Sequence, residues 1–266
     1  MFSFLYEDID FAHKLDRASS PDDEYGKHLH VFVELLYFVS GSVVYHVENR
    51  EKKLQKGDLI LIAPGNYHFA EVDRGNLYER YVFKFPAAFL PKHIDLDSLA
   101  EDPFFVADPL ILRLIQNFDS IYERFEGPDT YILFRNQIQN LLIFLSHLRT
   151  EGGSQTSDSV VSEAIRYIDS HIRDPLTLEG IAKDLHFSTS YLASRFKREM
   201  KTSIMRYVRS KKIVLAHALV SSGSKPHEVA EALSFDDYST FYRSYTKMIG
   251  RPPSGDRKKP REGFLQ

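Results

Sequence analysis

The feature that most constrains the fold is a repeat in the second half of the chain. Residues 181–187, "IAKDLHF", match residues 229–235, "VAEALSF", at an offset of 48. After a slip of one residue, the match continues through a second apolar stripe. The matched positions are Ile181/Val229, Ala182/Ala230, Leu185/Leu233, Phe187/Phe235, Leu192/Phe241, Phe196/Tyr245 and Met200/Ile249. A duplicated pattern of this kind predicts two copies of one supersecondary unit.

Each copy has the order short helix, tight turn, helix-capping residue and second helix. The N-cap candidates are Ser188 in the first copy and Asp236 or Asp237 in the second. The small side chains of Ala182 and Ala230 allow the two helices to approach closely, as a helix-turn-helix requires when its second helix enters a major groove. A single helical hairpin is a weak signal, and it is the duplication that favours DNA binding.

The segment between the copies, residues 202–222, is predicted to be one helix. Its inward residues are Ile204, Val208, Leu215 and Leu219. Roughly 20 residues span about 30 Å at the helical rise, and successive major-groove faces of B-DNA lie about 34 Å apart. A helix of this length would hold the two second helices in successive grooves.

Residues 176–257 resemble the double helix-turn-helix of the AraC-type (arabinose-regulator) transcription factors. The matching stretches are "LTLEGIAKDLHFSTSYLASRFKREM" and "HEVAEALSFDDYSTFYRSYTKMIGRPPSGDR". The family signature is followed in order by Ala182, Ser188, Tyr191-Leu192, Phe196, Ala216, Ala230, Phe235, Ser239, Phe241, Gly250, Pro253 and Arg257. The resemblance implies an all-α DNA-binding domain.

Three positions depart from the family pattern. Glycine is usual where Lys201 and Ser234 stand, and arginine where Lys212 stands. A lysine in the left-handed conformation at a helix end costs on the order of 1 kcal/mol. The first unit could therefore end differently and bind DNA more weakly, and a regulator that binds only another protein stays an alternative.

The second helix of each unit would carry the DNA contacts on its outward row. The resemblance places base-reading residues at Ser190, Ala193 and Ser194, whose short side chains suggest modest discrimination. In the second unit the outward row is Ser239, Tyr242, Arg243, Thr246 and Lys247. Arg243 is the strongest base-reading candidate beside Ser239, because arginine bonds guanine with two hydrogen bonds. A phosphate contact or an ion pair with Asp237 is the alternative for Arg243.

Charge is distributed unevenly along the chain. Residues 158–266 contain 19 Lys and Arg against 13 Asp and Glu, whereas residues 1–157 contain 15 against 24. A basic half joined to an acidic half suggests that only the second half meets a polyanion. The lysines and arginines that contact phosphates, or else only solvate the surface, would be Lys197, Arg198, Lys211, Lys212 and Lys247.

The first half is predicted to be an antiparallel β-structure followed by helices. Residues 28–85 alternate in short runs rich in Val, Tyr, Phe and Ile, broken by glycine and proline. From residue 108 the pattern becomes helical, with Leu110, Leu114 and Phe118 on one face of the first helix. The second helix has a stripe of Phe134, Ile138, Leu141, Leu142 and Leu145. These helices would either cover the barrel or pair with another subunit.

A histidine-rich motif precedes the glycine that ends one of these runs. Gly26, His28, His30, Glu34 and Gly41 fit G-x-H-x-H-x3-E-x6-G, and Gly57, Gly65 and His68 follow in a second motif. The pair resembles the two cupin motifs, and a cupin barrel is the usual sensor of AraC-type regulators. Alternation along one strand would turn His28, His30 and Glu34 into the barrel.

The effector pocket is expected to involve His28, His30, Glu34, Tyr45 and His68, and other aromatic candidates are Tyr37, Tyr67 and Phe69. No cofactor is expected, since regulators of this type usually sense without metal. The alternative is a divalent metal ion held by His28, His30, Glu34 and His68.

These observations predict an α+β protein with an N-terminal antiparallel β cupin barrel, flanking helices and a C-terminal all-α double helix-turn-helix domain. The expected boundaries are 1–107 for the barrel, 108–150 for a helical dimerisation or packing segment, 151–158 for a linker, and 159–266 for the DNA-binding domain. The linker is expected because "EGGSQTSD" is polar and glycine-rich.

The predicted function is sequence-specific transcriptional regulation controlled by a small molecule, without enzyme activity. The alternative is a metal-dependent cupin oxygenase or isomerase with a helical interaction module. Expected partners are an operator in double-stranded DNA, a sugar or other small metabolite, a second copy of the chain and RNA polymerase. The chain has no cysteine, no apolar run long enough to span a membrane and no secretion-signal pattern, so a cytoplasmic location is expected.

Overall fold

The computed structural model describes residues 1–17, 28–73, 75–148 and 159–256. The chain divides into two compact units, residues 1–155 and 156–266. Gly26, Arg257 and the predicted linker at 151–158 lie outside the described residues. Among the helices of the described ranges, none has both the length and the hydropathy needed to cross a bilayer.

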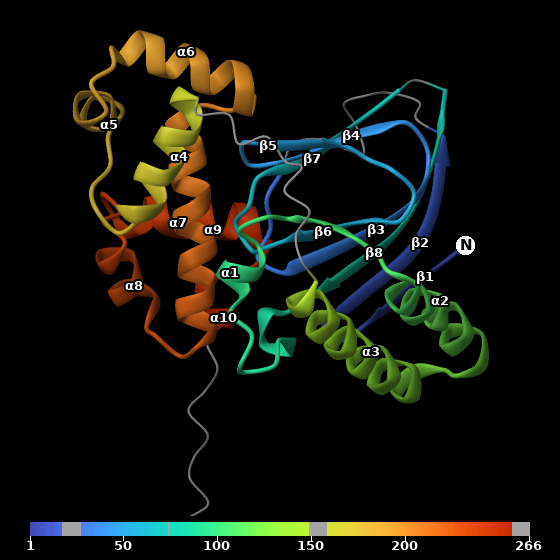
Figure 1. Ribbon diagram of the computed structural model, residues 1–266. Helices are drawn as coiled ribbons and strands as arrows, with labels where there is room; N and C mark the ends of the chain where they lie inside the picture. Colours follow the sequence, from blue (N-terminus) through green and yellow to red (C-terminus); the bar gives the residue numbers. More distant parts are fainter. Residues whose placement is uncertain (18–27, 74, 149–158, 257–266) are drawn as a thin grey trace, which may run out of the picture. The chain divides into compact units, whose positions relative to one another are not determined.

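The strands of the first unit form two antiparallel sheets, which confirms the predicted β-structure (Figure 1). The larger has the order β1-β2-β8-β3-β6-β9 and the smaller has the order β5-β4-β7. The bounds are β1 Phe2–Tyr6, β2 Ile9–Arg17, β3 Val33–Ser40, β4 Val43–Val47, β5 Arg50–Lys53, β6 Asp58–Ile62, β7 His68–Val72, β8 Leu77–Phe85 and β9 Phe104–Val106.

The larger sheet is apolar on both faces, and strand alternation separates two cores. On β3, Leu36 faces inward to a core that includes Val43 and Val72 of the smaller sheet. The next residue back, Leu35, belongs to the outer core with Phe118 and other helical residues. The chain passes from β3 to β4 at Gly41, whose φ of 136° and close approach to the carbonyl oxygen of Leu77 exclude a side chain.

Two long helices cover the outer face of the larger sheet. They are α2, Pro109–Arg124, and α3, Gly127–His147, and the short helices before them are η1 Ala87–Phe89 and α1 Leu96–Leu99. The predicted stripe on α3 is confirmed, because all five of its residues are fully buried. The helices therefore cover the barrel. Their pairing with a second subunit stays a prediction.

The predicted face of α2 is correct at Phe118, which is fully buried, and wrong at Leu110. The buried residues are Ile111, Ile115, Phe118 and Ile121, whereas Leu110 is 38% exposed and Leu114 is half-buried. The helix has two apolar rows that share Phe118. The row that also contains Ile111 and Ile115 packs on the sheet. Phe118 lies 5.1 Å from Phe11 between ring centroids, which fixes this rotation.

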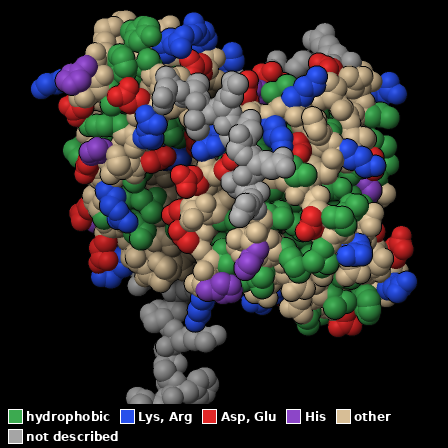
Figure 2. Space-filling view, viewed as in Figure 1, with side chains coloured by type: hydrophobic (Ala, Val, Ile, Leu, Met, Phe, Trp, Pro, Cys, Tyr) green, Lys and Arg blue, Asp and Glu red, His purple; other side chains and the backbone are tan. Residues whose placement is uncertain are grey.

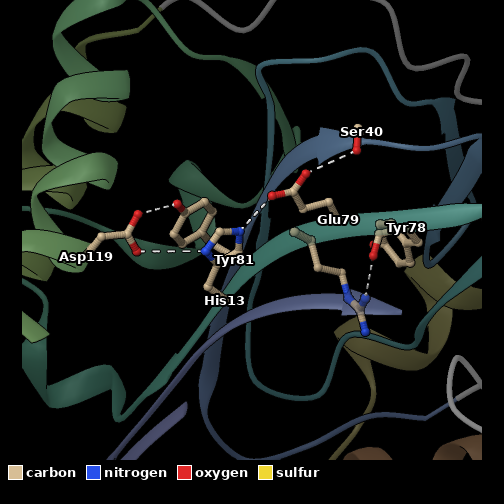
Figure 3. Close-up of polar contacts among 7 residues, drawn as sticks. His13, Ser40, Tyr78, Glu79, Tyr81 and Asp119 are labelled. Carbon is tan, nitrogen blue, oxygen red and sulfur yellow. Dashed lines mark hydrogen bonds and ion pairs between the residues drawn. The ribbon is translucent and has the colours of Figure 1, made fainter. Parts of the chain in front are cut away.

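Polar contacts fasten α2 to the strands beneath it (Figure 3). The hydroxyl of Tyr81 on β8 donates a hydrogen bond of 2.6 Å to Asp119 on α2. The ring of His13 on β2 stacks on Tyr81, with 4.0 Å between centroids, and its Nε2 lies 2.9 Å from Oε1 of Glu79. Glu79 and Tyr81 flank Arg80, which alternation places on the inner face of the same strand. A contact at Arg80 inside the barrel is thus one residue from the contacts that hold α2.

The second unit is helical and contains the predicted repeat. Its helices are α4 Val160–Ser170, α5 Leu178–Asp184, α6 Thr189–Met200, α7 Ile204–Ser221, α8 Pro226–Ala232, α9 Tyr238–Ile249 and α10 Pro253–Asp256. The tight turns after α5 and α8 have the same hydrogen bonds: Phe187 N–H donates to the Ala182 carbonyl at 2.8 Å, and Phe235 N–H to the Ala230 carbonyl at 3.1 Å. Both turns end a helix by the Schellman pattern.

The two units also end alike, although one lacks the usual glycine. Lys201 follows α6 with φ of 52°, and Gly250 follows α9 with φ of 82°. The first unit therefore keeps the left-handed ending that the family pattern implies, with a side chain in a conformation that favours glycine. The possibility that it ends differently is wrong. Between the units, α7 forms the predicted connecting helix, whose 18 residues span about 27 Å.

Candidate functional site

The second helix of each unit, α6 or α9, begins at a side-chain cap and buries one face. Ser188 accepts a hydrogen bond from Tyr191 N–H at 3.3 Å, and Asp237, not Asp236, accepts one from Thr240 N–H at 2.7 Å. The buried row of α6 is Leu192, Phe196 and Met200. In α9 the buried residues are Phe241 and Tyr245, with Met248 packed against them. The apolar residues of both helices therefore form the core of the unit.

The opposite rows face outward. On α6, Ser190, Ser194, Lys197 and Arg198 are exposed and Ala193 is half-buried. On α9, Ser239, Tyr242, Arg243 and Lys247 are exposed and Thr246 is half-buried. The two rows occupy equivalent places in the repeat, so each unit offers one helix face with short polar and cationic side chains.

Arg243 lies on the exposed row close to the cap of α9. Its Nη2 lies 3.3 Å from the hydroxyl oxygen of Thr240, to which it donates. That hydroxyl in turn donates to Asp237 at 2.8 Å. The guanidinium is therefore oriented through Thr240 over the first turns of the helix, with its planar fork toward solvent.

Phosphate contacts were predicted for residues on α6, α7 and α9, and these residues differ in exposure. Lys197, Arg198 and Lys247 are exposed, and Figure 2 shows Lys and Arg side chains gathered over α6. In contrast, Nζ of Lys211 lies 3.1 Å from Asp169, and the side chain is 13% exposed. Lys211 is therefore held by an intramolecular ion pair in this structure.

The phosphate contact predicted for Lys212 is contradicted. Lys212 is 5% exposed, and its ammonium donates hydrogen bonds of 2.8 Å to the carbonyl oxygens of Asp174 and Leu233. A third contact reaches the carbonyl oxygen of Ser234 at 3.5 Å. The ammonium therefore satisfies backbone groups at the end of α8, where a helix leaves carbonyls without partners. Burial lowers the pKa of Lys212.

In the first unit, four predicted residues converge on one place. A nitrogen or carboxylate oxygen from each of His28, His30, Glu34 and His68 lies within 4.8 Å of the others. The expected geometry is only partly correct, since β3 begins at Val33 and the two histidines precede it. His28 instead forms an isolated bridge with His68, with backbone hydrogen bonds of 3.2 and 3.0 Å. The cluster is thus closed by pairing with β7 and not by alternation along one strand.

The rings of the cluster are oriented by hydrogen bonds to the backbone. Nδ1 of His30 lies 2.9 Å from the carbonyl oxygen of Phe32, and Nδ1 of His68 lies 3.0 Å from that of Asn66. Each contact places a proton on Nδ1, because a carbonyl oxygen only accepts, and at His68 this leaves Nε2 as an acceptor. Nε2 of His30 meets Glu34 at 3.1 Å. Nε2 of the fully buried His68 has no hydrogen-bond partner among the described residues.

The protonation states of the cluster suit a cation. Burial raises the pKa of Glu34, but the bond to His30 and the charges of His68 and His30 outweigh it and lower the pKa to about 2. Burial lowers the pKa of His68 to about 3. The ionised carboxylate of Glu34 and the neutral imidazole of His68 are the forms in which these two groups bind metal ions. Together with the orphaned Nε2 of His68, this donor set fits a divalent transition metal ion.

A pocket adjoins the cluster between the two sheets. Its volume is about 130 Å³, and its lining consists of Lys14, His28, Glu34, Leu36, Tyr45, Phe69, Ala70, Tyr78, Arg80, Val82 and Lys84. The predicted residues Tyr45 and Phe69 contribute to this lining. Tyr37 does not, because it faces the opposite side of β3 and belongs to the outer core.

Sequence reasoning missed the three cations of the pocket, Lys14, Arg80 and Lys84. They lie on β2 and β8 and form no motif in the sequence. The available signal was alternation, since Arg80 and Lys84 share a strand face with Val82. The strand register explains why Lys14 lies on the same face, because Lys14 pairs directly with Arg80.

Two family models match the chain, one in each unit. The model described as AraC-like ligand binding domain matches residues 13–126, and the model described as Helix-turn-helix domain matches residues 181–259. The pocket lies within the first range, and both exposed helix rows lie within the second.

Curated relatives extend over most of the chain. The arabinose operon regulatory protein of Salmonella typhimurium is 25% identical over 224 residues, which cover 81% of this chain and 80% of that protein. The HTH-type transcriptional regulator YobQ of Bacillus subtilis is 23% identical and covers 86% of this chain and 87% of its own. Among solved structures, ToxT from Vibrio cholerae O395 covers 92% of this chain and 96% of its own, with 11% identity and a TM-score of 0.41.

Both matched domains occur in the order that the sequence predicted, and the relatives that cover most of the chain are transcriptional regulators. The chain therefore belongs to the AraC-type family of transcriptional regulators, with a ligand-binding domain followed by a helix-turn-helix DNA-binding domain.

Proposed function

We propose that a small molecule bound in the barrel pocket changes how α6 and α9 meet an operator. The observation that carries this proposal is the pair of exposed rows on equivalent helices of the repeat. The helix α7 joins them, and its length of about 27 Å is close to the distance of about 34 Å between successive major-groove faces. The coupling would be a free energy shared between two sites. A candidate route begins at Arg80 in the pocket and continues through Glu79 and Tyr81 to α2.

Base discrimination would come mainly from α9. The exposed rows supply Ser190, Ala193 and Ser194 from α6, and Ser239 and Arg243 from α9. The short side chains of α6 support weak discrimination there, whereas a guanidinium can bond guanine with two hydrogen bonds. Lys197, Arg198 and Lys247 would contact phosphates on the same face.

The first experiment is a genomic pull-down with the full-length protein. We expect recovered fragments to share a sequence with two half-sites spaced by about one helical turn. A triple variant of Lys197, Arg198 and Lys247 to alanine should recover little DNA. The control, with alanine at Lys53, Lys56 and Lys92 in the first unit, should recover as much DNA as the wild type. Fragments without any shared sequence would contradict specific regulation and favour a chain that binds only protein.

A homodimer would form through the outer faces of α2 and α3. These faces expose apolar side chains: Leu110, Tyr122 and Phe125 on α2 or just after it, and Ile132, Ile143 and Phe144 on α3. A second copy of the same face would remove them from water. Ile143→Lys should give monomers in sedimentation, with Lys53→Glu on β5 as an exposed control outside this face. A dimer that survives both Ile143→Lys and Ile132→Lys would contradict this face.

A dimer at an operator would act in the cytoplasm, where chromosomal DNA is accessible, and RNA polymerase is the further partner that activation would require.

We also propose that the cluster of His28, His30, Glu34 and His68 holds a divalent metal ion. The unpartnered, buried Nε2 of His68 supports this second feature. When bound, such an ion would supply a positive centre that accepts oxygen ligands from a small molecule. The four side chains orient it, and the backbone contacts at Nδ1 of His30 and His68 hold the rings in place.

Metal analysis of protein purified without chelators tests this site. We expect near-stoichiometric iron, manganese, nickel or zinc that disappears in a His30→Ala/His68→Ala variant and persists in His227→Ala, whose ring is exposed on α8. Wild-type protein that binds none of these ions after refilling would contradict the metal site. Stoichiometric metal together with turnover of a substrate would favour the alternative of a metal-dependent oxygenase or isomerase.

A further inference from the structure

The pocket carries more positive than negative side chains. Three cations line it, Lys14, Arg80 and Lys84, against the single carboxylate of Glu34. Glu34 is already bonded to His30 at 3.1 Å. Arg80 and Lys84 have carboxylate partners outside the lining, Asp16 at 2.8 Å and Asp10 at 3.7 Å. Lys14 adds a third positive charge to this partly desolvated site, where an unpaired charge is costly.

Two of these cations lie opposite each other across β2 and β8, and one of the two has a carboxylate partner. Lys14 on β2 lies directly opposite Arg80 on β8 in the antiparallel register, and like charges at such positions repel. Arg80 is 7% exposed and is held by Asp16 at 2.8 Å. The side chain of Lys14 forms no ion pair or hydrogen bond with another residue of the described ranges. The pair therefore presents one fixed guanidinium and one ammonium that an incoming anion can engage.

The floor of the pocket separates this pair from a second polar end. Leu36 and Val82 are paired across β3 and β8, and one strand step beyond them Glu34 pairs with Lys84. Arg80 and Lys84 are four residues apart on β8, about 13 Å between their backbone positions, and both side chains line the same pocket. The polar end next to Lys84 also contains His28, which belongs to the histidine cluster.

The size limits the occupant. A volume of about 130 Å³ is about four times the share of one water molecule in the liquid, and it is well below the range of drug-sized pockets. An occupant of this volume that meets both polar ends over the apolar floor is a short chain with a polar group at each end.

We infer that the effector is a small carboxylate, with one carboxylate bridging Lys14 and Arg80 and a second polar group toward Lys84 and His28. This inference deepens the proposed function and rests on it, since it names the class of molecule that the ligand-binding domain senses. Arginine holds a carboxylate with fixed geometry, and Lys14 supplies the closing charge.

Direct binding to the full-length protein tests the effector class. Isothermal titration uses malonate and succinate as probes, malonamide and succinamide as neutral counterparts, and L-arabinose as a sugar. Each probe is titrated into metal-free protein and into protein refilled with zinc. We expect a dicarboxylate to bind and raise the melting temperature, and the matching diamide and the sugar not to do so.

Variants of the lysine keep the test specific. Lys14→Met should weaken dicarboxylate binding by about tenfold to a hundredfold, as the loss of a charged hydrogen bond does. Lys14→Arg should retain it, and Lys53→Met, an exposed lysine on a strand outside the pocket, should change it by less than about twofold. Because Lys14 is exposed, neither variant at this position should impair folding.

The outcomes separate this inference from the proposed function. Diamide or arabinose binding as strong as that of the dicarboxylates would overturn the carboxylate class, as would a Lys14→Met variant that binds like wild type. No binding by any dicarboxylate, with or without zinc, would also overturn it. Operator binding is measured separately, so a protein that binds succinate but recovers no shared DNA sequence would contradict the proposed regulation and leave the effector class supported.

Discussion

Lys201 and Gly250 occupy the same place in the two units of the repeat, and both have a left-handed backbone. Lys201 follows α6 with φ of 52° and ψ of 18°, and Gly250 follows α9 with φ of 82° and ψ of −2°. A side chain at Cβ makes this conformation less favourable by about 1 kcal/mol. The first unit therefore carries a local strain that the second unit avoids.

Replacing this lysine by glycine should stabilise the protein. Lys201→Gly is expected to raise the free energy of unfolding of the helical unit by about 0.5–1 kcal/mol, because the backbone strain is removed. Urea unfolding followed by circular dichroism measures the change. Lys197→Gly is the matched control, since Lys197 lies within α6, and it should lower the same free energy by about 1 kcal/mol. Equal destabilisation by the two substitutions would show that the ending of α6 is unstrained.

The buried ammonium of Lys212 makes a second stability prediction. Lys212→Met removes the ammonium that donates to the carbonyl oxygens of Asp174 and Leu233, and the Asp174 oxygen keeps only its bond from Leu176 N–H at 2.9 Å. We expect a loss of about 2–3 kcal/mol in the free energy of unfolding. Lys211→Met removes a single ion pair to Asp169 and should cost about 1 kcal/mol or less. If the two neighbours cost the same, Lys212 is not a structural residue.

The sequence predicted the helical unit more completely than the barrel because its signals are local. The cap at Ser188, the small residue Ala182 and the apolar spacing each act within a few residues, and their duplication marks both units. Lys212 escaped prediction since "KK" in a basic helix indicates solvent or phosphate. Only the carbonyl oxygens that the fold brings from α8 explain its burial.

In the barrel, the motif predicted which residues meet but not how they meet. His28 and His68 are 40 positions apart in the sequence and join through an isolated bridge, which depends on sheet register. The cation pair of Lys14 and Arg80 has the same origin, since strand pairing cannot be read from composition. The face of α2 was predicted correctly only at Phe118, because two apolar rows share this residue and the sequence does not show that Ile111 and Ile115 form the buried row.

The stability of the helical unit should depend on pH through His217. This ring lies among Tyr245, Asp256 and Arg251: its Nδ1 is 2.9 Å from the Tyr245 hydroxyl, which donates to Asp256 at 2.8 Å, and Asp256 accepts from Arg251. Burial lowers the pKa of His217, and the charge of Asp256 offsets only part of this effect. A folded pKa below the unfolded value of 6.5 means that the unfolded chain takes up the proton first.

The stabilisation is therefore fully present above pH 6.5 and is lost as the pH falls toward the lower folded pKa of His217. Chemical unfolding at pH 7.5, 6.5 and 5.5 should show a decreasing free energy in the wild type. His217→Gln should flatten this dependence, whereas His227→Gln, with a side chain that is 68% exposed, should leave it unchanged. A slope that is identical in all three proteins would assign the dependence to other groups.

Arg243 should matter for operator sequence and Lys247 for DNA in general. Both are exposed on α9, but only a guanidinium can make two hydrogen bonds to one base edge. Arg243→Ala is expected to weaken operator binding by about 1–3 kcal/mol and to relax preference at one base pair. Lys247→Ala should weaken operator and unrelated DNA equally and reduce the salt dependence by about one phosphate contact.

Fluorescence anisotropy at several salt concentrations, with operator and scrambled duplexes, measures both effects. Arg113→Ala removes an exposed arginine of α2 in the other unit and serves as the control, with operator affinity expected to stay within about twofold of wild type. Folding of Arg243→Ala is checked by its unfolding transition, because the side chain donates to Thr240 at 3.3 Å. If Arg243→Ala lowers the affinity for scrambled and operator DNA by the same factor, the guanidinium contacts a phosphate and base selection must come from the shorter side chains of the two exposed rows.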